Sequence, residues 1–245
     1  MAATPDSPNG AGGPGLAERL AAVRTRIEAA AGRAGRRPED ITLLAVSKTQ
    51  SAEAVRALAD AGHRAFAESY AQEAADKQAA TADLDLEWHF VGPLQSNKAK
   101  LVAPAFAMVH SVDRLKTARA LDRHRPESAP LDICLQVNVS GEASKSGCRP
   151  DELTGLARAV AEECPRLRPR GLMAIPAPGE SPEAVRPAFR RLAGLLAALR
   201  EEDPAAPWDV LSMGMSGDFE VAIEEGATHV RVGTALFGER RYSPK

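Results

Sequence analysis

The stretch DVLSMGMSGDFEVAIEEGATHVRVG, residues 209–233, contains two short apolar runs with a helical pattern between them. The runs at 209–215 and 229–233 have the length and the apolar content of buried strands. We expect a helix to begin after Ser216 and Gly217, between the two runs. Because a strand that is followed by a helix and a second strand usually pairs with it in parallel, this stretch predicts one unit of a parallel sheet.

The same alternation continues through the rest of the chain. Further candidate strands lie at 41–47, 64–68, 87–92, 107–112, 132–139 and 171–175. Predicted helices, rich in Ala, Leu and Arg, lie between some of them at 52–60, 152–163 and 182–201. Eight strands that alternate with helices predict an α/β protein with a single (β/α)8 barrel, the TIM-barrel fold.

The N-terminal part of the chain precedes the predicted barrel. Residues 1–15 are rich in Pro, Gly and Ala and have neither the basic start nor the apolar core of a targeting signal, so we expect a disordered tail. An extra helix is predicted over 16–31, because its leucine, valine and isoleucine side chains recur at helical spacing. This leaves 16–245 as a single domain.

The composition limits the classes of partner. The chain has 245 residues, 44% of them hydrophobic, which is enough for one substantial core. Its net charge of -2 gives no sign of nucleic-acid binding, and it has no apolar stretch long enough to span a membrane. Three cysteines without a CxxC pair suit a reducing compartment. We therefore expect a cytoplasmic monomer whose partners are small molecules.

Lys48 stands at the end of the first predicted strand. Active sites of TIM barrels lie at the C-terminal ends of the strands. Alternation along the strand places Leu44, Val46 and Lys48 on one face, toward the barrel axis. The strand alone leaves two interpretations open: a solvated lysine at the rim of the barrel, or a lysine that forms a Schiff base with a ligand.

The loops after the last two predicted strands are candidate phosphate-binding loops. Ser216 and Gly217 follow the seventh strand, and Gly233 and Thr234 follow the eighth. Exposed backbone N–H groups at the start of helices favour an anion there. Taken singly, Ser216 is also explained as a helix N-cap and Gly233 as a tight turn, but their occurrence at both expected loops favours a phosphate ligand.

Arg231 lies between Val230 and Val232 in the eighth strand. If the valines face the helices, the guanidinium group points into the barrel, where it needs a ligand or a carboxylate as its partner. A ligand with a phosphate and an aldehyde would use both halves of the site, with the phosphate at the loops and the aldehyde at a lysine amine. Pyridoxal 5'-phosphate (PLP) has this chemistry.

Longer motifs occur in order along almost the whole chain. They are AVSKTQ at 45–50, WHFVGPLQSNK at 88–98, VHSVDR at 109–114, VNVSGEASKSG at 137–147, GLMAIP at 171–176, LSMGMSGDFEVAI at 211–223 and VRVGTALFGER at 230–240. With these motifs the chain resembles the pyridoxal phosphate homeostasis protein family. The resemblance implies the barrel domain of alanine racemase, the fold type III of PLP proteins, and PLP held by Lys48 as an internal aldimine. It also implies Ser216, Gly233 and Thr234 at the phosphate, with Arg231 near either the pyridine nitrogen or the phosphate.

The second predicted strand departs from the family pattern. Where the family has Phe-Gly-Glu-Asn, this chain has Phe66, Ala67, Glu68 and Ser69. The alanine adds a methyl group, and the serine shortens a polar side chain that can approach the cofactor. Ser69 is therefore included among the candidate cofactor-binding residues, with an altered contact.

Other residues have an ordinary structural explanation beside a functional one. His89 fits either the barrel mouth or a hydrogen-bonded position inside the barrel. Lys98 and Lys145 are either part of a polar rim around a ligand or solvated loop residues. Met213 and Met215 are expected to pack. No group of His, Cys, Asp and Glu has metal-ligand spacing, so no metal site is predicted.

Three functional classes fit a barrel with a Schiff-base lysine. A racemase or decarboxylase of this type takes an acid–base group from a second β-domain, and this chain ends soon after the eighth strand. A Schiff-base aldolase more usually has its lysine on a later strand. We therefore expect a non-enzymatic protein of intracellular PLP (vitamin B6) homeostasis, which carries PLP and passes it to apo forms of PLP-dependent enzymes. A PLP-dependent racemase-like enzyme is the alternative.

Overall fold

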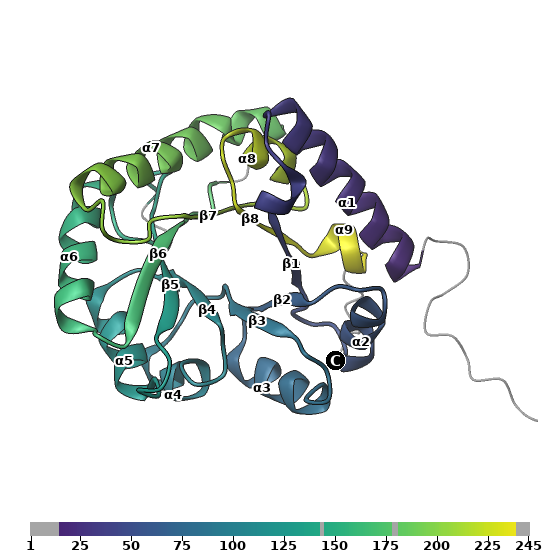
Figure 1. The fold of residues 1–245 in the computed structure, drawn as a ribbon, viewed down its shortest axis with the longest axis horizontal. Helices are drawn as coiled ribbons and strands as arrows, with labels where there is room; N and C mark the ends of the chain where they lie inside the picture. The colour runs from purple at the N-terminus through teal and green to yellow at the C-terminus, as the bar shows by residue number, and fades with distance from the viewer. Residues whose placement is uncertain (1–14, 143–144, 178–180, 239–245) are drawn as a thin grey trace, which may run out of the picture.

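The computed structural model describes residues 15–142, 145–177 and 181–238. Its strands pair in chain order and in parallel, and β8 pairs with β1, so the sheet is a closed barrel (Figure 1). The helices lie around the outside of the strands, and α1 packs against α8 and α9. The predicted TIM barrel with an extra N-terminal helix is confirmed. Of the expected tail, residues 1–14 lie outside the described residues.

The elements alternate along the chain as the pattern predicts. The strands are β1 (Thr42–Val46), β2 (Ala65–Glu68), β3 (Glu87–Phe90), β4 (Met108–Val112), β5 (Leu131–Gln136), β6 (Leu167–Met173), β7 (Val210–Met215) and β8 (His229–Val232). The α-helices are α1 (Leu16–Arg33), α2 (Ala52–Asp60), α3 (Ala71–Ala80), α4 (Ala99–Val102), α5 (Leu115–His124), α6 (Leu153–Glu163), α7 (Arg186–Glu202), α8 (Phe219–Glu224) and α9 (Thr234–Phe237). Short 3₁₀ helices lie at Pro38–Asp40, Ser96–Lys98, Pro150–Glu152 and Pro182–Val185. The last of these and α7 together replace the single helix predicted at 182–201.

The strand β6 differs from its prediction, because it begins at Leu167 rather than at Gly171. Two arginines in this segment argue against a buried strand when only the sequence is considered. In the fold, Arg168 and Arg170 contact the Asp132 carboxylate of β5 at 2.5 and 2.8 Å. The charges are therefore paired at the N-terminal end of the barrel, and the strand can extend through them.

Side chains of the strands alternate between two faces of the sheet. Leu43 and Phe66 belong to the large core between the strands and the helices, whereas Leu44, Ala67 and Val91 form a separate cluster inside the barrel. Burial of one Leu or Phe side chain contributes roughly 1.5–3 kcal/mol. The alternation expected for β1 is therefore present, with its even-numbered residues directed inward.

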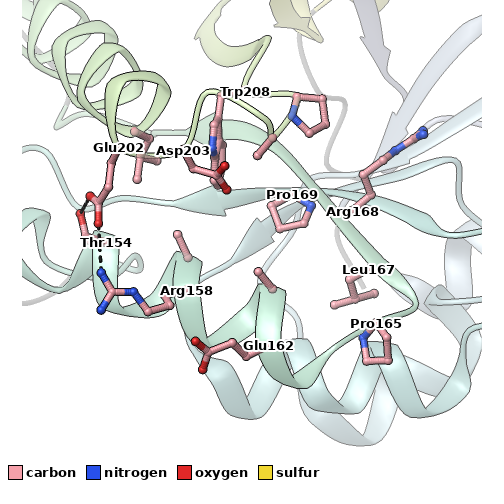
Figure 2. Close-up of a pocket in the computed structure, with 15 residues that line it drawn as sticks. Thr154, Arg158, Glu162, Pro165, Leu167, Arg168, Pro169, Glu202, Asp203 and Trp208 are labelled. Atoms are coloured by element: carbon pink, nitrogen blue, oxygen red, sulfur yellow. Dashed lines mark hydrogen bonds and ion pairs between the residues drawn. The ribbon is translucent and has the colours of Figure 1, made fainter.

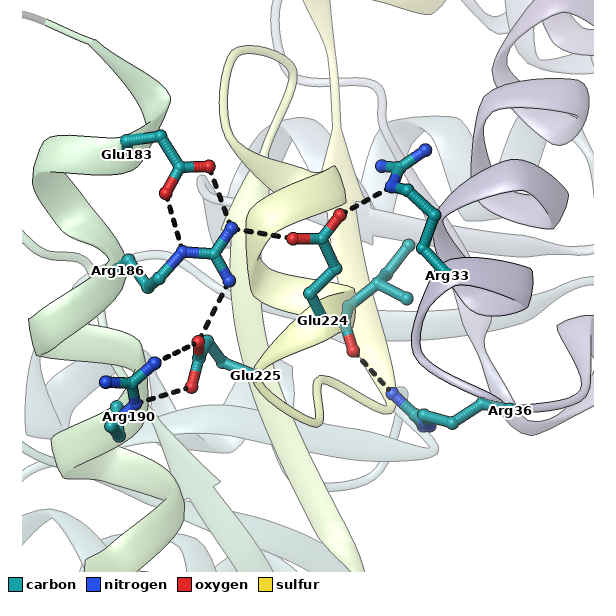
Figure 3. A network of polar contacts seen from close by, with 8 residues as sticks. Arg33, Arg36, Glu183, Arg186, Arg190, Glu224 and Glu225 are labelled. Atoms are coloured by element: carbon teal, nitrogen blue, oxygen red, sulfur yellow. Dashed lines mark hydrogen bonds and ion pairs between the residues drawn. The ribbon is translucent and has the colours of Figure 1, made fainter.

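A network of charged side chains connects α1 and α7 to α8 (Figure 3). Arg186 donates to Glu224 at 2.6 Å and to Glu225 at 2.9 Å. Arg33 of α1 donates to the same Glu224 at 2.7 Å, and Arg190 of α7 donates to Glu225 at 2.9 Å. An isolated surface pair contributes at most about 1 kcal/mol, but here each carboxylate joins two arginines. The network holds α1 against the unit that carries the candidate phosphate loops.

Candidate functional site

A pocket of about 310 Å³ opens at the C-terminal ends of the strands. It is lined by Val46, Lys48, Ser69, Val91, Ile175, Met215, Ser216, Gly217, Arg231, Gly233 and Thr234. All of the candidate cofactor-binding residues are in this set, although they lie far apart in the sequence. Closure of the barrel explains how they meet, because β1 and β8 pair with Leu44 opposite Arg231.

Lys48 enters this pocket from the segment that follows β1. Val46 and Lys48 both line the pocket, whereas Ser47 between them is fully buried and donates to Glu68 Oε1 at 2.7 Å. Lys48 itself is half-buried. The lysine therefore faces the pocket, as the alternation along β1 predicts, and is not a fully solvated rim residue.

Ser216 connects the loops that follow β7 and β8. Its Oγ accepts hydrogen bonds from the backbone N–H groups of Gly233, at 3.1 Å, and Ala235, at 3.3 Å. The N-cap of the helix after β7 is Asp218 and not Ser216. Gly233 has a φ of -114°, which other residues also adopt. Ser216 is therefore not the N-cap of α8, and its hydroxyl instead joins N–H donors from the start of α9, where Gly233 opens the first turn.

Arg231 is 4% exposed and lines the same pocket. It donates to the Ser212 hydroxyl and to the Ala174 carbonyl, both at 2.9 Å. Burial lowers the pKa of Arg231 to about 10, against the opposing influence of Asp218, so the group stays protonated at neutral pH. Within the described ranges Arg231 forms no ion pair, so the expected carboxylate partner is not found there. Its hydrogen bonds within these ranges therefore go to neutral acceptors, and the Asp218 carboxylate acts on it only from a distance.

The second strand places Ser69 at the pocket and Ala67 inside the barrel. Ala67 is fully buried in a cluster with Leu44 and Val91, so the fold accommodates the additional methyl group. Gly92, after β3, passes so close to this segment that a Cβ atom there would lie 2.1 Å from the Ser69 carbonyl oxygen. The close approach explains the glycine, which the sequence shows only as one letter of a motif.

Three histidines lie together inside the barrel, outside the pocket lining. His89 Nδ1 is 2.9 Å from His110 Nε2, and His89 Nε2 is 2.9 Å from Glu87 Oε1. Burial lowers the pKa of His229 to about 3 and holds that of His110 well below its ordinary value. His89 is therefore the hydrogen-bonded barrel histidine and not a mouth residue.

The rim of the pocket is partly apolar. Ile175 and Met215 are each 38% exposed and line the pocket, whereas Met213 is fully buried. The expectation that both methionines only pack is therefore right for Met213 and incomplete for Met215. Lys145 is half-buried and lines two adjoining pockets of about 180 and 330 Å³, and Lys98 is exposed. Lys145 thus belongs to the surroundings of the mouth.

A larger pocket, of about 540 Å³, lies at the other end of the barrel (Figure 2). It is formed between α6 and α7, beside Leu167 at the start of β6 and Trp208 just before β7. Arg158 and Glu202 form an ion pair of 3.1 Å in its wall. Its described lining contains no lysine, histidine or cysteine. The N-terminal face of a TIM barrel is normally concerned with stability, so this pocket is not the candidate for Schiff-base chemistry.

The same described ranges hold no sign of a metal site or a membrane-spanning helix. They contain no group of three or more His, Cys, Asp or Glu residues that could hold a metal ion. No helix among them is both long enough and apolar enough to cross a membrane. The three cysteines are buried free thiols.

Comparison with known proteins gives the family. The family model for the alanine racemase N-terminal domain matches residues 19–241. The pyridoxal phosphate homeostasis protein of Pseudomonas aeruginosa is 57% identical over 228 residues, which cover 93% of this chain and 96% of that protein. Its Escherichia coli K12 counterpart is 52% identical over 234 residues, covering 94% and 99%.

A solved structure extends the comparison to a bound ligand. PipY from Synechococcus elongatus PCC7942, in a structure with PLP bound, is 37% identical to this chain. The two superpose with a TM-score of 0.80 over 91% of this chain and 100% of that one. The matches agree with the barrel and with the motifs found along the sequence. The chain belongs to the pyridoxal phosphate homeostasis protein family, whose members share the fold of the alanine racemase N-terminal domain.

Proposed function

We propose that this protein binds PLP at the C-terminal mouth of its barrel and serves PLP homeostasis by holding the cofactor and releasing or transferring it. One observation carries the proposal: an amine, a serine hydroxyl that accepts from two backbone N–H groups, and a buried cation meet in a single pocket of about 310 Å³. The names of the curated relatives and the PLP-bound structure of PipY support the same conclusion.

The donors of the pocket fit the groups of PLP. The N–H groups of Gly233 and Ala235 point to Ser216 Oγ, where a phosphate oxygen can share or replace that acceptor. Among its described lining residues there is no Asp or Glu, so an anionic phosphate meets no like charge. Bound PLP would supply an aldehyde, whose carbon bonds to a lysine nitrogen with loss of its oxygen as water. Lys48 is the lysine of this pocket.

The residues take separate roles in this proposal. Ser216, Gly233 and Thr234 hold the phosphate, and Ser69 contributes a polar contact at the opposite edge. Arg231 is fixed by acceptors on β7 and just after β6, and neither acceptor belongs to the β8–α9 loop that carries the N–H donors. We assign its charge to the ring of the cofactor rather than to the phosphate. A permanent cation at the pyridine nitrogen disfavours protonation of that nitrogen and weakens the ring as an electron sink.

In this proposal the protein carries PLP and does not racemise amino acids. Turnover of an amino acid needs a second group to move a proton, and the described pocket lining contains no His, Tyr, Cys, Asp or Glu. The relatives are named homeostasis proteins, which agrees with this choice. The partly exposed Ile175 and Met215 leave the mouth open for loading and release.

The proposal also covers the domain organisation, the oligomeric state, the cellular location and the partners of the protein. Residues 16–245 act as one PLP-binding domain, a monomer in the cytoplasm, with apo forms of PLP-dependent enzymes as acceptors. The scheme requires no metal ion, and the described residues contain no group of three or more His, Cys, Asp or Glu that could hold one.

Two measurements test the function. Purified protein mixed with PLP should develop a visible absorbance band, and an added apo-enzyme that depends on PLP should then gain activity as the band declines. Incubation with L-alanine in deuterated water should give no protein-dependent exchange of the α-proton. Absence of the band would refute PLP binding, and rapid exchange would place the protein among the racemases.

A further inference from the structure

The residues on both sides of Lys48 are anchored to β2 and α3, behind the strand. Ser47 donates through its hydroxyl to Glu68 Oε1 at 2.7 Å, and its carbonyl oxygen accepts from Lys77 Nζ at 2.5 Å. On the other side, the Thr49 backbone N–H donates to Glu73 Oε1 at 2.5 Å. The backbone that carries Lys48 is therefore fixed both before and after the lysine.

Lys77 is the centre of this cluster. It is 5% exposed, and its Nζ also donates to Glu68 Oε1 at 2.7 Å and to Glu73 Oε1 at 2.6 Å. With the Ser47 carbonyl, these acceptors use the full donor capacity of an ammonium group. One side chain thus connects both anchors, because Glu68 holds Ser47 and Glu73 holds the residue after Lys48.

The backbone next to Lys48 is in an unusual conformation. Thr49 has a φ of 67° and is the one non-glycine residue with positive φ in the described part of the chain. A β-branched residue is disfavoured in this region, so its surroundings must hold it there. Two hydrogen bonds hold Thr49 there: the Gln50 N–H donates to the Ser47 carbonyl at 2.9 Å, which closes a turn around Lys48 and Thr49, and the Thr49 N–H donates to Glu73 Oε1.

Stability alone is a poor explanation for the cluster. Glu68 is fully buried, burial raises its pKa against the hydrogen bonds of Lys77 and Ser47, and its Oε2 has no hydrogen-bond partner among the described residues. Apolar side chains of similar size would often stabilise such a site at least as well. The charged groups do provide directed bonds to the backbone on either side of Lys48, which apolar groups cannot.

We propose that Glu68, Glu73 and Lys77 are positioning residues for Lys48. They fix the backbone before and after the lysine, so that its amine is held toward the pocket and the Ser216 loop instead of sampling the solvent. Restricting the amine to one direction raises the rate at which it meets an aldehyde bound in the pocket. This inference rests on the proposed function, because it concerns the reaction of Lys48 with PLP.

Glu73 offers the sharpest test, since its side chain is 30% exposed and its removal leaves the buried Lys77–Glu68 pair in place. In Glu73→Ala the Thr49 N–H loses its acceptor, and we expect PLP to load on the order of tenfold more slowly. The visible circular dichroism of the bound cofactor, which reports its orientation, should weaken. Glu73→Gln keeps an acceptor oxygen and should restore both signals. Asp76→Ala, an exposed acid on the same helix, is the matched control and should resemble the parent.

Each outcome decides between the proposals. Thermal unfolding should first show that all three variants are folded. If the parent does not bind PLP on Lys48, the proposed function fails. If the parent loads normally and Glu73→Ala loads at the same rate with the same visible circular dichroism, the positioning role is refuted while the function stands. The positioning role is also refuted if Glu73→Gln fails to restore the signals or if Asp76→Ala shows the same defect.

Discussion

Two buried cations lie near the candidate site, and they differ in their partners: one contacts carboxylates and the other contacts neutral groups. Lys77, 5% exposed, contacts two carboxylates and a carbonyl behind β1. Arg231, 4% exposed, donates among the described residues only to a hydroxyl and a carbonyl. A buried charge without a counter-charge is unfavourable. The chain itself completes the surroundings of Lys77, and the difference supports the proposal that a ligand completes those of Arg231.

Replacement of the balanced cation should have the largest effect on stability. Lys77→Met leaves the Glu68 carboxylate buried without its counter-charge, and we expect the free energy of unfolding to fall by about 3–5 kcal/mol. Urea unfolding measures this. The exposed lysine of α5 provides the control, because Lys116→Met should change stability very little. Equal stability of the two variants would mean that the cluster behind β1 is not formed as described.

Replacement of Arg231, the cation without a contacting carboxylate, should reduce PLP retention clearly and stability only moderately. Arg231→Met removes a charge and leaves only the Ser212 and Ala174 acceptors without donors, so we expect a loss of roughly 1–3 kcal/mol in unfolding free energy. Retention of PLP, measured by dialysis and visible absorbance, should fall clearly. Arg123→Met, at an exposed site, should affect neither quantity. A stability loss as large as that of Lys77→Met with unchanged PLP retention would contradict the comparison.

The phosphate side of the pocket should show a smaller effect. Ser216→Ala removes one hydrogen-bonding group from the proposed phosphate contact, which corresponds to about 1.5–3 kcal/mol. PLP should therefore leave roughly tenfold to hundredfold faster, while Lys48 still reacts. Transfer to an apo-enzyme acceptor measures the release rate, with exposed Ser128→Ala as the control. Unchanged release would remove Ser216 from the phosphate site.

Buried histidines extend the comparison to groups that remain neutral. Burial is the main cause that lowers the pKa of His63 to about 4. Because its folded pKa lies below the unfolded value, stability is fully present above the unfolded pKa and is lost as the pH falls from there toward the folded pKa. Between about pH 7.5 and about pH 5.5 this histidine should contribute a loss of about 1 kcal/mol.

The variant His63→Gln should reduce the loss of stability over this pH range by that amount. Chemical unfolding at a series of pH values measures it, and the exposed His124→Gln serves as the control. If the parent and His63→Gln lose stability in parallel, the acid sensitivity comes from other groups.

The sequence alone predicts the barrel, and it predicts that the candidate residues come together at one end of it. Strand alternation placed Lys48 and Arg231 on the inner face, and parallel strands bring their C-terminal ends to one mouth. The start of β6 was missed because Arg168 and Arg170 do not look like strand residues until Asp132 pairs with them. That pairing joins segments far apart in the chain, so it cannot be predicted from the sequence around either arginine.

The cluster behind β1 was also missed. Glu73 and Lys77 lie four residues apart on a helix, which is the usual pattern of an exposed ion pair. Only the packing of α3 on β2 shows that Lys77 is buried against Glu68 and against the backbone beside Lys48. The contacts of Ser216 depend in the same way on loops that meet only after the barrel closes.

The central claim is that Lys48 is the lysine that bonds to PLP in this pocket, and peptide mapping tests it most directly. The protein is mixed with PLP, reduced with borohydride and digested, and the labelled lysine is identified by mass spectrometry. We predict that the label lies on Lys48 and that Lys48→Ala, folded and otherwise treated alike, loses it. A label found mainly on Lys98 or Lys145 in the parent, or retained in full by Lys48→Ala, would contradict the account.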